Sequence, residues 1–375
     1  MTVRQNVKYK LPASRRKNSH PFYWLLALAL AVFLGWLWWN SGKTSSPPPA
    51  KNASVGVKTN IPVPTHRDTT TPPNPPPLAP ANAKVAPTQY PRPVQNAFEA
   101  QVVLVSLGIS PGSLDGAIGS QTRAALAAFQ KSEGLPVTGS LDPLTRTNLL
   151  LDESPYTTYT VTSNDLARLQ PLAATWLGKS QQTALDYETI LELVAEKTFA
   201  HPTLIRQLNP AVNWTNIRVQ TTVIVPNVSY PDDPGKAAWV TIHLNSKVLE
   251  AFDAETNLIA HFPCSIAKHV EKRPVGLLHV VVVAPHPNYT FDPDVFPESA
   301  EAKQLGRKLV LPPGPNNPVG VVWIGLDRPG YGMHGTPSPE LVGRTESHGC
   351  FRLANWNAEY LLRLIAIGTP VYVVE

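Results

Sequence analysis

An uncharged apolar run near the N-terminus constrains the architecture of this chain more than any other feature. It extends from Pro21 to Trp39, 19 residues without a charged side chain, and as an α-helix it would be about 28 Å long. That length is enough to cross the hydrocarbon core of a bilayer. Trp24 at one end and Trp38-Trp39 at the other suit the aromatic belts of a membrane. We therefore predict a transmembrane helix over residues 21–39.

The residues before this run set its expected orientation. Six basic and no acidic residues lie within positions 1–20, so these positions are expected to form a cytoplasmic tail, with everything after about residue 40 exported. A cleaved signal peptide is the alternative. The apolar run is longer than the apolar h-region of a usual signal peptide, however, and Leu37-Trp38-Trp39 places bulky side chains where a signal peptidase requires small ones. We expect a retained single-pass anchor in the inner membrane and a periplasmic body.

The distribution of charge argues against a nucleic-acid partner. The chain has 375 residues and a formal net charge of +5, with 32 Lys and Arg against 27 Asp and Glu. The six basic residues of the tail account for that excess, since the remaining 26 face 27 acidic residues. A near-neutral body lacks the basic surface that DNA or RNA binding requires.

A proline-rich segment follows the apolar run. The chain contains 40 prolines, and residues 40–93 include the stretches SSPPPAK and TPPNPPPLAPANAK with few large apolar side chains. Such a composition cannot bury a core and favours an extended spacer. We expect residues 40–93 to be a linker that holds the folded domains away from the membrane.

Residues 94–151 have the pattern of a small all-α domain. Ser120 is placed to cap a helix with an apolar face, and Gly134 stands where the C-terminal cap of that helix would lie. The sequence Gly-Ser-Leu-Asp occurs at 112–115 and again at 139–142. Together with Asp115-Gly116 and Phe129-Gln130, these residues resemble the three-helix peptidoglycan-binding domain of wall hydrolases. A structural helical spacer remains the alternative.

Residues 156–228 predict a second small unit of strand, helices and strand. TYTVTSNDLARL is followed by the helical segments ETILELVAEKTF and HPTLIRQLNP, and by the β-branched run TTVIVPNV. This order resembles an α+β LysM-like wall-binding module, with an insertion around residues 170–187 that departs from the compact pattern. The alternative is a linker domain with no ligand.

From Lys236 to Glu375 the chain consists of short strands separated by turn residues. The runs AAWVTIHLN, LLHVVVVA and VGVVWIGL are rich in Val, Ile and Leu and predict a sheet-dominated domain. The segment NWNAEYLLRLIAIG predicts one helix with Leu361, Leu362 and Ile365 on one buried face, and PVYVVE predicts a final strand. We expect residues 236–375 to form a mainly-β domain.

Two short motifs in this last domain are typical of nucleophilic catalysis. The first is Met333-His334-Gly335-Thr336, and the second runs from Ser347 through His348, Gly349 and Cys350 to Asn355. A thiol attacks an amide carbonyl only after losing its proton, so it requires a base, and His334 and His348 are the candidates. Gly349 allows the backbone to approach a substrate closely, and backbone N–H groups around it are candidate oxyanion donors.

Arg352 completes this set. In an extended segment it lies on the same face as Cys350, and its guanidinium can bind a substrate carboxylate through two parallel hydrogen bonds. The two motifs therefore supply a nucleophile, a base and an anchor for an anionic substrate.

These residues resemble the catalytic motif of YkuD-type L,D-transpeptidases: a His-Gly pair, a loop, Ser/Thr-His-Gly-Cys, a hydrophobic residue, Arg and a later Asn. The resemblance covers residues 236–375 and implies a mixed-sheet sandwich. It implies that Cys350 is the nucleophile and His334 its base, oriented by a backbone carbonyl near Gly335. It places His348 and Gly349 at the reacting centre. Substrate binding is assigned to Arg352, Ser347, Gly335 and Asn355.

Three positions depart from the family pattern. Arg273-Pro274-Val275-Gly276 replaces a turn that usually carries Thr-Pro before Gly, Phe351 replaces an aliphatic residue, and Asn357 stands where Asp is frequent. None of them removes a reacting group. We expect these departures to affect substrate preference.

Two alternative readings apply to the cysteines and histidines. His334, His348 and Cys350 are possible zinc ligands, but the chain has no HExxH pair, so we expect no metal and no cofactor. The only other cysteine, Cys264, lies in the apolar run HFPCSIA and is expected to be a buried strand residue. A disulfide between Cys264 and Cys350 would abolish the thiol chemistry.

The resemblance implies a peptidoglycan L,D-transpeptidase that releases D-alanine from a tetrapeptide stem and forms 3–3 cross-links. Its partners would be peptidoglycan stem peptides and glycan. An L,D-carboxypeptidase with water as the acceptor is one alternative, and a wall-anchoring scaffold without activity is another. One sequence does not decide between an amine and water as the acceptor.

Overall fold

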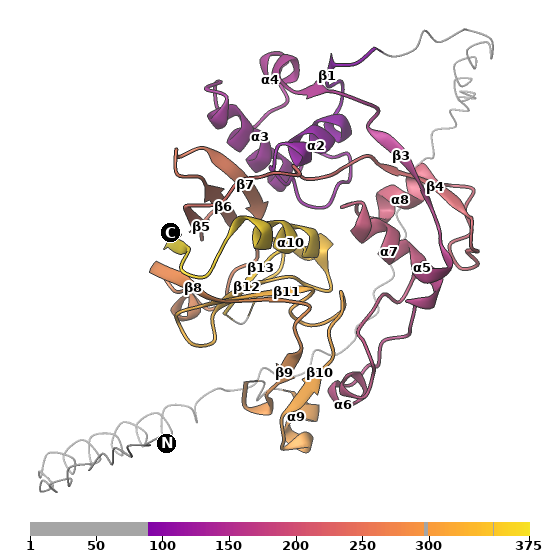
Figure 1. Ribbon diagram of the computed structural model, residues 1–375, viewed down its shortest axis with the longest axis vertical. Coiled ribbons are helices and arrows are strands. Elements are labelled where there is room, and N and C mark those ends of the chain that lie inside the picture. The colour runs from indigo at the N-terminus through magenta and orange to yellow at the C-terminus, as the bar shows by residue number, and fades with distance from the viewer. Residues whose placement is uncertain (1–88, 296–298, 348) are drawn as a thin grey trace, which may run out of the picture. The chain divides into compact units, whose positions relative to one another are not determined.

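The computed structural model describes residues 89–295, 299–347 and 349–375 (Figure 1). The basic tail, the predicted anchor at 21–39 and nearly all of the linker lie outside these ranges. Within the part that is described, no helix is both long enough and apolar enough to cross a membrane.

The N-terminal domain is helical. It contains α2 (Ala97–Ser106), α3 (Ser120–Ser132) and α4 (Pro143–Asn148), and a short pair of strands, β1 (Arg92–Pro93) and β2 (Leu150–Leu151), joins its two ends. Gly119, not Ser120 as predicted, is the N-cap of α3, and no side chain caps that end. Gly134 follows the helix with a left-handed φ of 65°, as a residue just past a helix end requires.

Two buried glutamines give this domain an internal repeat. The side-chain amide of Gln101 donates to Thr122 Oγ1 at 3.1 Å, and its oxygen accepts from Gly116 N at 2.9 Å. Gln130 does the same with Thr145 Oγ1 at 2.8 Å and Gly139 N at 2.8 Å. Each fully buried amide thus holds one of the two Gly-Ser-Leu-Asp loops against the following helix. The repeated sequence reflects repeated loop anchoring.

The middle unit is a two-stranded antiparallel sheet with helices between its strands. Its elements are β3 (Tyr156–Thr160), α5 (Ser163–Ala167), α6 (Trp176–Ser180), α7 (Ile190–Lys197), α8 (Pro202–Leu208) and β4 (Thr222–Pro226). Capping boxes at Thr162–Asp165 and Thr189–Glu192 begin α5 and α7. The inserted α6 lies beside strands of the last domain (Figure 1).

The last domain is built on one eight-stranded mixed sheet with the order β13-β12-β11-β8-β14-β5-β6-β7. The strands are β5 (Trp239–His243), β6 (Val248–Phe252), β7 (Leu258–Pro263), β8 (Gly276–Pro285), β11 (Val322–Leu326), β12 (Gly332–His334), β13 (Phe351–Arg352) and β14 (Pro370–Val374). The pairs β14–β5 and β12–β13 are parallel, and the other pairs are antiparallel.

The two ends of this sheet meet. Ser265, just beyond β7, pairs with Arg352 of β13 through two backbone hydrogen bonds of 2.9 and 3.0 Å. Because β7 and β13 are the outer strands, this bridge curls the sheet onto itself. The predicted two-sheet sandwich is therefore wrong in detail: a single sheet encloses the core, and closure rather than a facing sheet protects its edges.

One helix, α10 (Asn355–Leu364), packs against this sheet. Leu361 and Ile365 are buried on its predicted apolar face, whereas Leu362 is only partly buried, and Trp356 and Tyr360 enlarge that face. A smaller hairpin of β9 (Tyr289–Phe291) and β10 (Leu309–Leu311), with α9 (Ala300–Leu305), extends from the loop between β8 and β11.

Candidate active site

His334 lies at the end of β12, between two paired strands. It pairs with Trp323 of β11 and with Arg352 of β13, and it is buried. Its Nδ1 is 2.6 Å from the carbonyl oxygen of Gly335. A carbonyl only accepts, so Nδ1 carries the proton and Nε2 is the atom that can receive one. The predicted orienting carbonyl is the one observed.

Cys350 follows a tight turn that Ser347 holds. Ser347 Oγ donates to the Cys350 carbonyl oxygen at 2.5 Å and accepts from Gly349 N at 3.3 Å. The Ser347 amide also donates to Ile266 O at 2.8 Å. The Cys350 thiol donates to the carbonyl of Gly330 at 3.4 Å. Ser347 thus shapes the turn that presents the thiol. His348 lies outside the described residues.

The protonation states differ from those of a preformed ion pair. Burial lowers the pKa of His334 to about 4, so its imidazole is neutral at neutral pH. Burial also raises the pKa of the Cys350 thiol, although a backbone hydrogen bond from Gly332 and the charge of Arg352 act in the opposite direction. The Cys350 thiol and the His334 imidazole are therefore both neutral at neutral pH. They would become charged only on transfer of the thiol proton.

Both side chains line one cavity of about 340 Å³. Arg352, Ser347 and Gly349 line it too, so five of the eight predicted site residues meet there. The ring of Trp323 stacks on the imidazole of His334 with centroids 5.7 Å apart. The other lining residues are mostly apolar: Trp176, Tyr289, Val295, Pro318, Val319 and Gly330.

Asn355 and Gly335 have other partners than a substrate. Asn355 is buried; its Oδ1 accepts from Thr336 N at 2.9 Å and from Val321 N at 3.3 Å. A Cβ on Gly335 would lie 2.1 Å from the same oxygen. In the structure these two residues hold the segment after His334 in place. Substrate binding by Gly335 and Asn355 stays a prediction.

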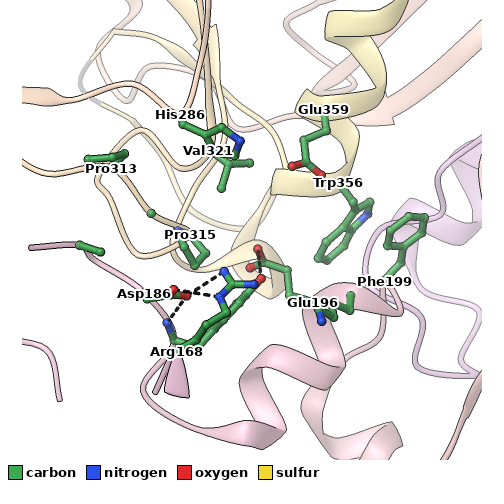
Figure 2. Close-up of a pocket in the computed structure, with 14 residues that line it drawn as sticks. Arg168, Asp186, Glu196, Phe199, His286, Pro313, Pro315, Val321, Trp356 and Glu359 are labelled. Carbon is green, nitrogen blue, oxygen red and sulfur yellow. Dashed lines mark hydrogen bonds and ion pairs between the residues drawn. The ribbon is translucent and has the colours of Figure 1, made fainter. Parts of the chain in front are cut away.

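A carboxyl group from the middle unit completes this support. Glu196 of α7 accepts from Asn355 Nδ2 at 3.0 Å and from the hydroxyl of Tyr187 at 3.2 Å. Burial raises the pKa of Glu196 to about 8. Figure 2 shows Glu196 facing a cavity of about 500 Å³ that Trp356 and Glu359 of α10 also line. The middle unit is thus hydrogen-bonded, through Asn355, to the segment that follows His334.

Sequence reasoning missed the aromatic walls of the site. Trp323 lies in the strand-like run VGVVWIGL shortly before His334 in the sequence, so its proximity was detectable. Tyr289 and Trp176 come from the β9–β10 hairpin and from the insertion of the middle unit, more than 60 and 170 residues from Cys350 in sequence. No local pattern links those positions to the thiol.

The two cysteines are not bonded to each other. Both are free; Cys264 is fully buried, and burial raises its pKa to about 12. The disulfide alternative is therefore wrong. Among the residues that the structure describes, no three His, Cys, Asp or Glu side chains form a metal-binding group. The zinc alternative includes His348, which lies outside that set.

Comparisons with known proteins agree with this architecture. Residues 237–373 match the YkuD family, described as "L,D-transpeptidase catalytic domain", and residues 95–149 match a family described as "Putative peptidoglycan binding domain". The chain is 25% identical over 185 residues to the "Putative L,D-transpeptidase YkuD" of Bacillus licheniformis, covering 49% of this chain and 92% of that protein. It is 36% identical over 78 residues to the "Probable L,D-transpeptidase YbiS" of Escherichia coli, covering 20% of this chain and 25% of that protein.

Solved structures give a weaker likeness. An L,D-transpeptidase from Xylanimonas cellulosilytica is 17% identical, with a TM-score of 0.31, and the match covers 76% of this chain and 98% of that one. The two family matches and the curated relatives carry more weight than this structural likeness. Residues 237–373 are similar to the L,D-transpeptidase catalytic domain of the YkuD family, and the helical domain before them is similar to a peptidoglycan-binding domain.

Proposed function

We propose that this chain is a peptidoglycan L,D-transpeptidase with Cys350 as its nucleophile. The observation that carries the proposal is the arrangement of Cys350 and His334 in one cavity, with His334 Nδ1 fixed by the Gly335 carbonyl. This leaves Nε2 of a neutral imidazole to accept the thiol proton. The predicted absence of a cofactor is consistent with this chemistry.

The reaction proceeds by acyl transfer. Nε2 of His334 takes the thiol proton as Sγ bonds to the L-centred third-residue carbonyl of a tetrapeptide stem. The resulting oxyanion is met by backbone N–H groups near Gly349 and Cys350. The tetrahedral intermediate then loses the C–N bond to D-alanine, whose amine leaves with the proton from His334. A side-chain amine of a second stem attacks the thioester, forms the 3–3 cross-link and regenerates the thiol.

The acceptor separates this proposal from its nearest alternative. Water in place of the amine gives an L,D-carboxypeptidase, and both reactions pass through the same thioester. The apolar lining of the cavity favours the amine, because it limits the water around the thioester. A wall-anchoring scaffold without activity would have no need of the fixed His334 tautomer.

The reaction is tested with defined tetrapeptide muropeptides and mass spectrometry of the products. We expect D-alanine release and a cross-linked dimer from the wild type, and neither from Cys350→Ala. Cys264→Ala is the matched control and should retain activity. By family resemblance, a carbapenem should add its mass to the wild type and not to Cys350→Ala. Inactivation by a chelator, or D-alanine release by Cys350→Ala, would refute the nucleophile assignment and favour the zinc alternative.

The proposed location is the periplasmic face of the inner membrane. The basic tail at 1–20 and the apolar run at 21–39 support a retained anchor. The middle unit, whose paired strands β3 and β4 enclose four helices, is proposed to bind glycan because its sequence resembles a LysM module with an insertion. Fractionation of cells tests the anchor, since a soluble product beginning near residue 42 would contradict it.

A further inference from the structure

The inserted α6 of the middle unit is packed tightly against the catalytic domain. The ring of Trp176 stacks on Phe291 of β9, with centroids 4.4 Å apart and planes at 16°. The amide of Leu177 donates to Glu301 of α9 at 3.0 Å. Leu185, at the end of the insertion, is fully buried in a small core with Phe291 and Leu311. The insertion therefore belongs to the architecture of the catalytic domain.

Trp176 also lines two neighbouring cavities. The first, of about 340 Å³, contains Cys350 and His334. The second, of about 370 Å³, is lined by Lys179 of the same helix and by residues of the loop after His334, among them Thr336 and Ser338. Trp176, Pro318 and Arg352 are common to both. The two cavities thus meet at one tryptophan and one arginine.

The charge of this paired cleft is one-sided. Lys179 and Arg352 line it, and no Asp or Glu is among the described residues that line either cavity. Within the described chain, neither cation has a carboxylate at salt-bridge distance; Lys179 Nζ lies 5.6 Å from the ring centroid of Trp176, and Arg352 donates to the carbonyl of Glu346 at 3.2 Å. Two cations without acidic partners beside a thiol suit an anionic ligand.

We propose that the insertion of the middle unit forms a substrate-binding wall of the active site, in which Lys179, with Arg352, binds a carboxylate of the stem peptide. Trp176 is the apolar surface on which the peptide backbone lies between the two cavities. This inference rests on the proposed function for the identity of the ligand. It assigns to the middle unit a role in peptide recognition, separate from any binding of glycan.

The test measures binding without turnover, in the full chain carrying Cys350→Ala. The probes are three synthetic tetrapeptides. The first has all its carboxylates free, the second has a carboxamide in place of its C-terminal carboxylate, and the third has a carboxamide in place of a carboxylate within the chain. Calorimetry gives the dissociation constant of each. We expect Lys179→Ala to weaken binding of the free acid about three- to tenfold, as loss of a partly exposed charge-assisted contact would.

The two amidated peptides identify the carboxylate concerned. The peptide that lacks the carboxylate bound by Lys179 should bind Lys179→Ala and its parent with equal affinity. The other amidated peptide should bind Lys179→Ala more weakly than the parent, as the free acid does. Lys303→Ala, on α9 and lining neither cavity, is the matched control and should bind all three peptides like the parent. Equal losses for all three peptides, or no loss for any, would overturn the inference.

Trp176→Leu tests the apolar surface. It should weaken all three peptides by a similar factor, about three- to tenfold. Trp214→Leu, in the same unit but lining neither cavity, should bind all three peptides like the parent. An unchanged affinity in Trp176→Leu, or a loss confined to one peptide, would overturn the role assigned to Trp176. Absence of turnover in the wild type would refute the proposed function, whereas the binding pattern judges the inference independently.

Discussion

His334 combines a fixed tautomer with a low proton affinity, and both follow from its place in β12. The Gly335 carbonyl accepts from Nδ1, and burial makes the imidazolium unfavourable. An exposed histidine would be about half protonated near pH 6.5. The buried one has a pKa of about 4, so its imidazole stays neutral at neutral pH.

The pH dependence of the reaction should report this shift. A base must be unprotonated to act, so activity is lost as the pH falls through the pKa of His334, which burial lowers to about 4. We expect the acid limb of kcat/KM for a soluble tetrapeptide to lie near pH 4, because kcat/KM reports the free enzyme. An acid limb near pH 6.5 would indicate an exposed base and contradict the geometry. His269→Gln, an exposed histidine, is the control and should leave the profile unchanged.

Glycine occupies positions 335 and 349 of the two motifs for different physical reasons. A Cβ on Gly335 would lie 2.1 Å from Asn355 Oδ1, whereas a Cβ on Gly349 would meet only Tyr331 Cε1, at 3.9 Å. Gly335→Ala should therefore lower the free energy of unfolding by about 1–3 kcal/mol through overpacking. Gly349→Ala should change it by less than about 0.5 kcal/mol.

Activity should separate the same two variants. The methyl group of Gly349→Ala enters space beside Cys350 that a substrate needs, so D-alanine release should fall although the fold is intact. Thermal unfolding and product release, measured on both variants, check this. A stable and fully active Gly349→Ala enzyme would show that the glycine serves neither packing nor substrate approach.

At the scale of elements, local sequence patterns predicted individual strands and helices but did not predict the closure of the sheet. The β-branched runs predicted the strands, and the spacing of Leu361 and Ile365 predicted the buried face of α10. The bridge between Ser265 and Arg352 joins segments 87 residues apart, so no periodicity shows that the sheet curls onto itself. Arg352 therefore has a structural pairing that its motif did not reveal.

Long-range contacts also explain what the sequence could not predict in the candidate site. Asn355 was predicted to bind substrate because it stands in the motif, whereas its hydrogen bond to Glu196 joins residues 159 positions apart. Trp176 was missed because no local pattern links it to Cys350. Local motifs marked Cys350 and His334 as candidates, and no motif marked contacts that depend on docking of another unit.

The contact between α7 and α10 predicts a pH-dependent stability. Glu196 has a pKa of about 8 in the folded protein because of burial, against 4.5 for an unperturbed glutamate. Between these values the folded state holds a proton that the unfolded state has released, so the free energy of unfolding falls as the pH rises from about 4.5 to 8.

Glu196→Gln removes this titration and keeps an oxygen to accept from Asn355. We expect the melting temperature of Glu196→Gln to equal that of the wild type near pH 5 and to exceed it near pH 8.5. Glu196→Ala leaves the Asn355 amide without this acceptor and should melt lower at both pH values. Wild-type and Glu196→Gln curves that run in parallel across this range would contradict the proposed protonation of Glu196.

At the scale of the whole described chain, the helical domain is joined to the sheet and not merely tethered to it. Residues 108–110 run beside β7: Ser110 N donates to His261 O at 2.8 Å, and His261 N donates to Gly108 O at 3.1 Å. Gln121 of α3 also donates to the carbonyl of Val342 at 2.5 Å. The helical domain thus pairs with β7 at His261, whereas the bridge from Ser265 to Arg352 closes the sheet only just beyond the end of β7.

Removal of the helical domain should therefore destabilise the catalytic domain. We expect residues 152–375 alone to melt about 5–10 °C below residues 89–375, from loss of two strand-like hydrogen bonds and the burial of Ile109. Gly108→Ala is a gentler comparison, because its Cβ would lie 2.6 Å from Ile259 O at a φ of 79°. This substitution should lower the melting temperature less than removal of the helical domain does. The Gly108→Ala chain should still sediment with purified wall sacculi as the unmodified chain does. If residues 152–375 keep the melting temperature of residues 89–375, the helical domain is only tethered to the sheet. A loss of sedimentation with sacculi in the shortened chain would then report a loss of wall binding alone.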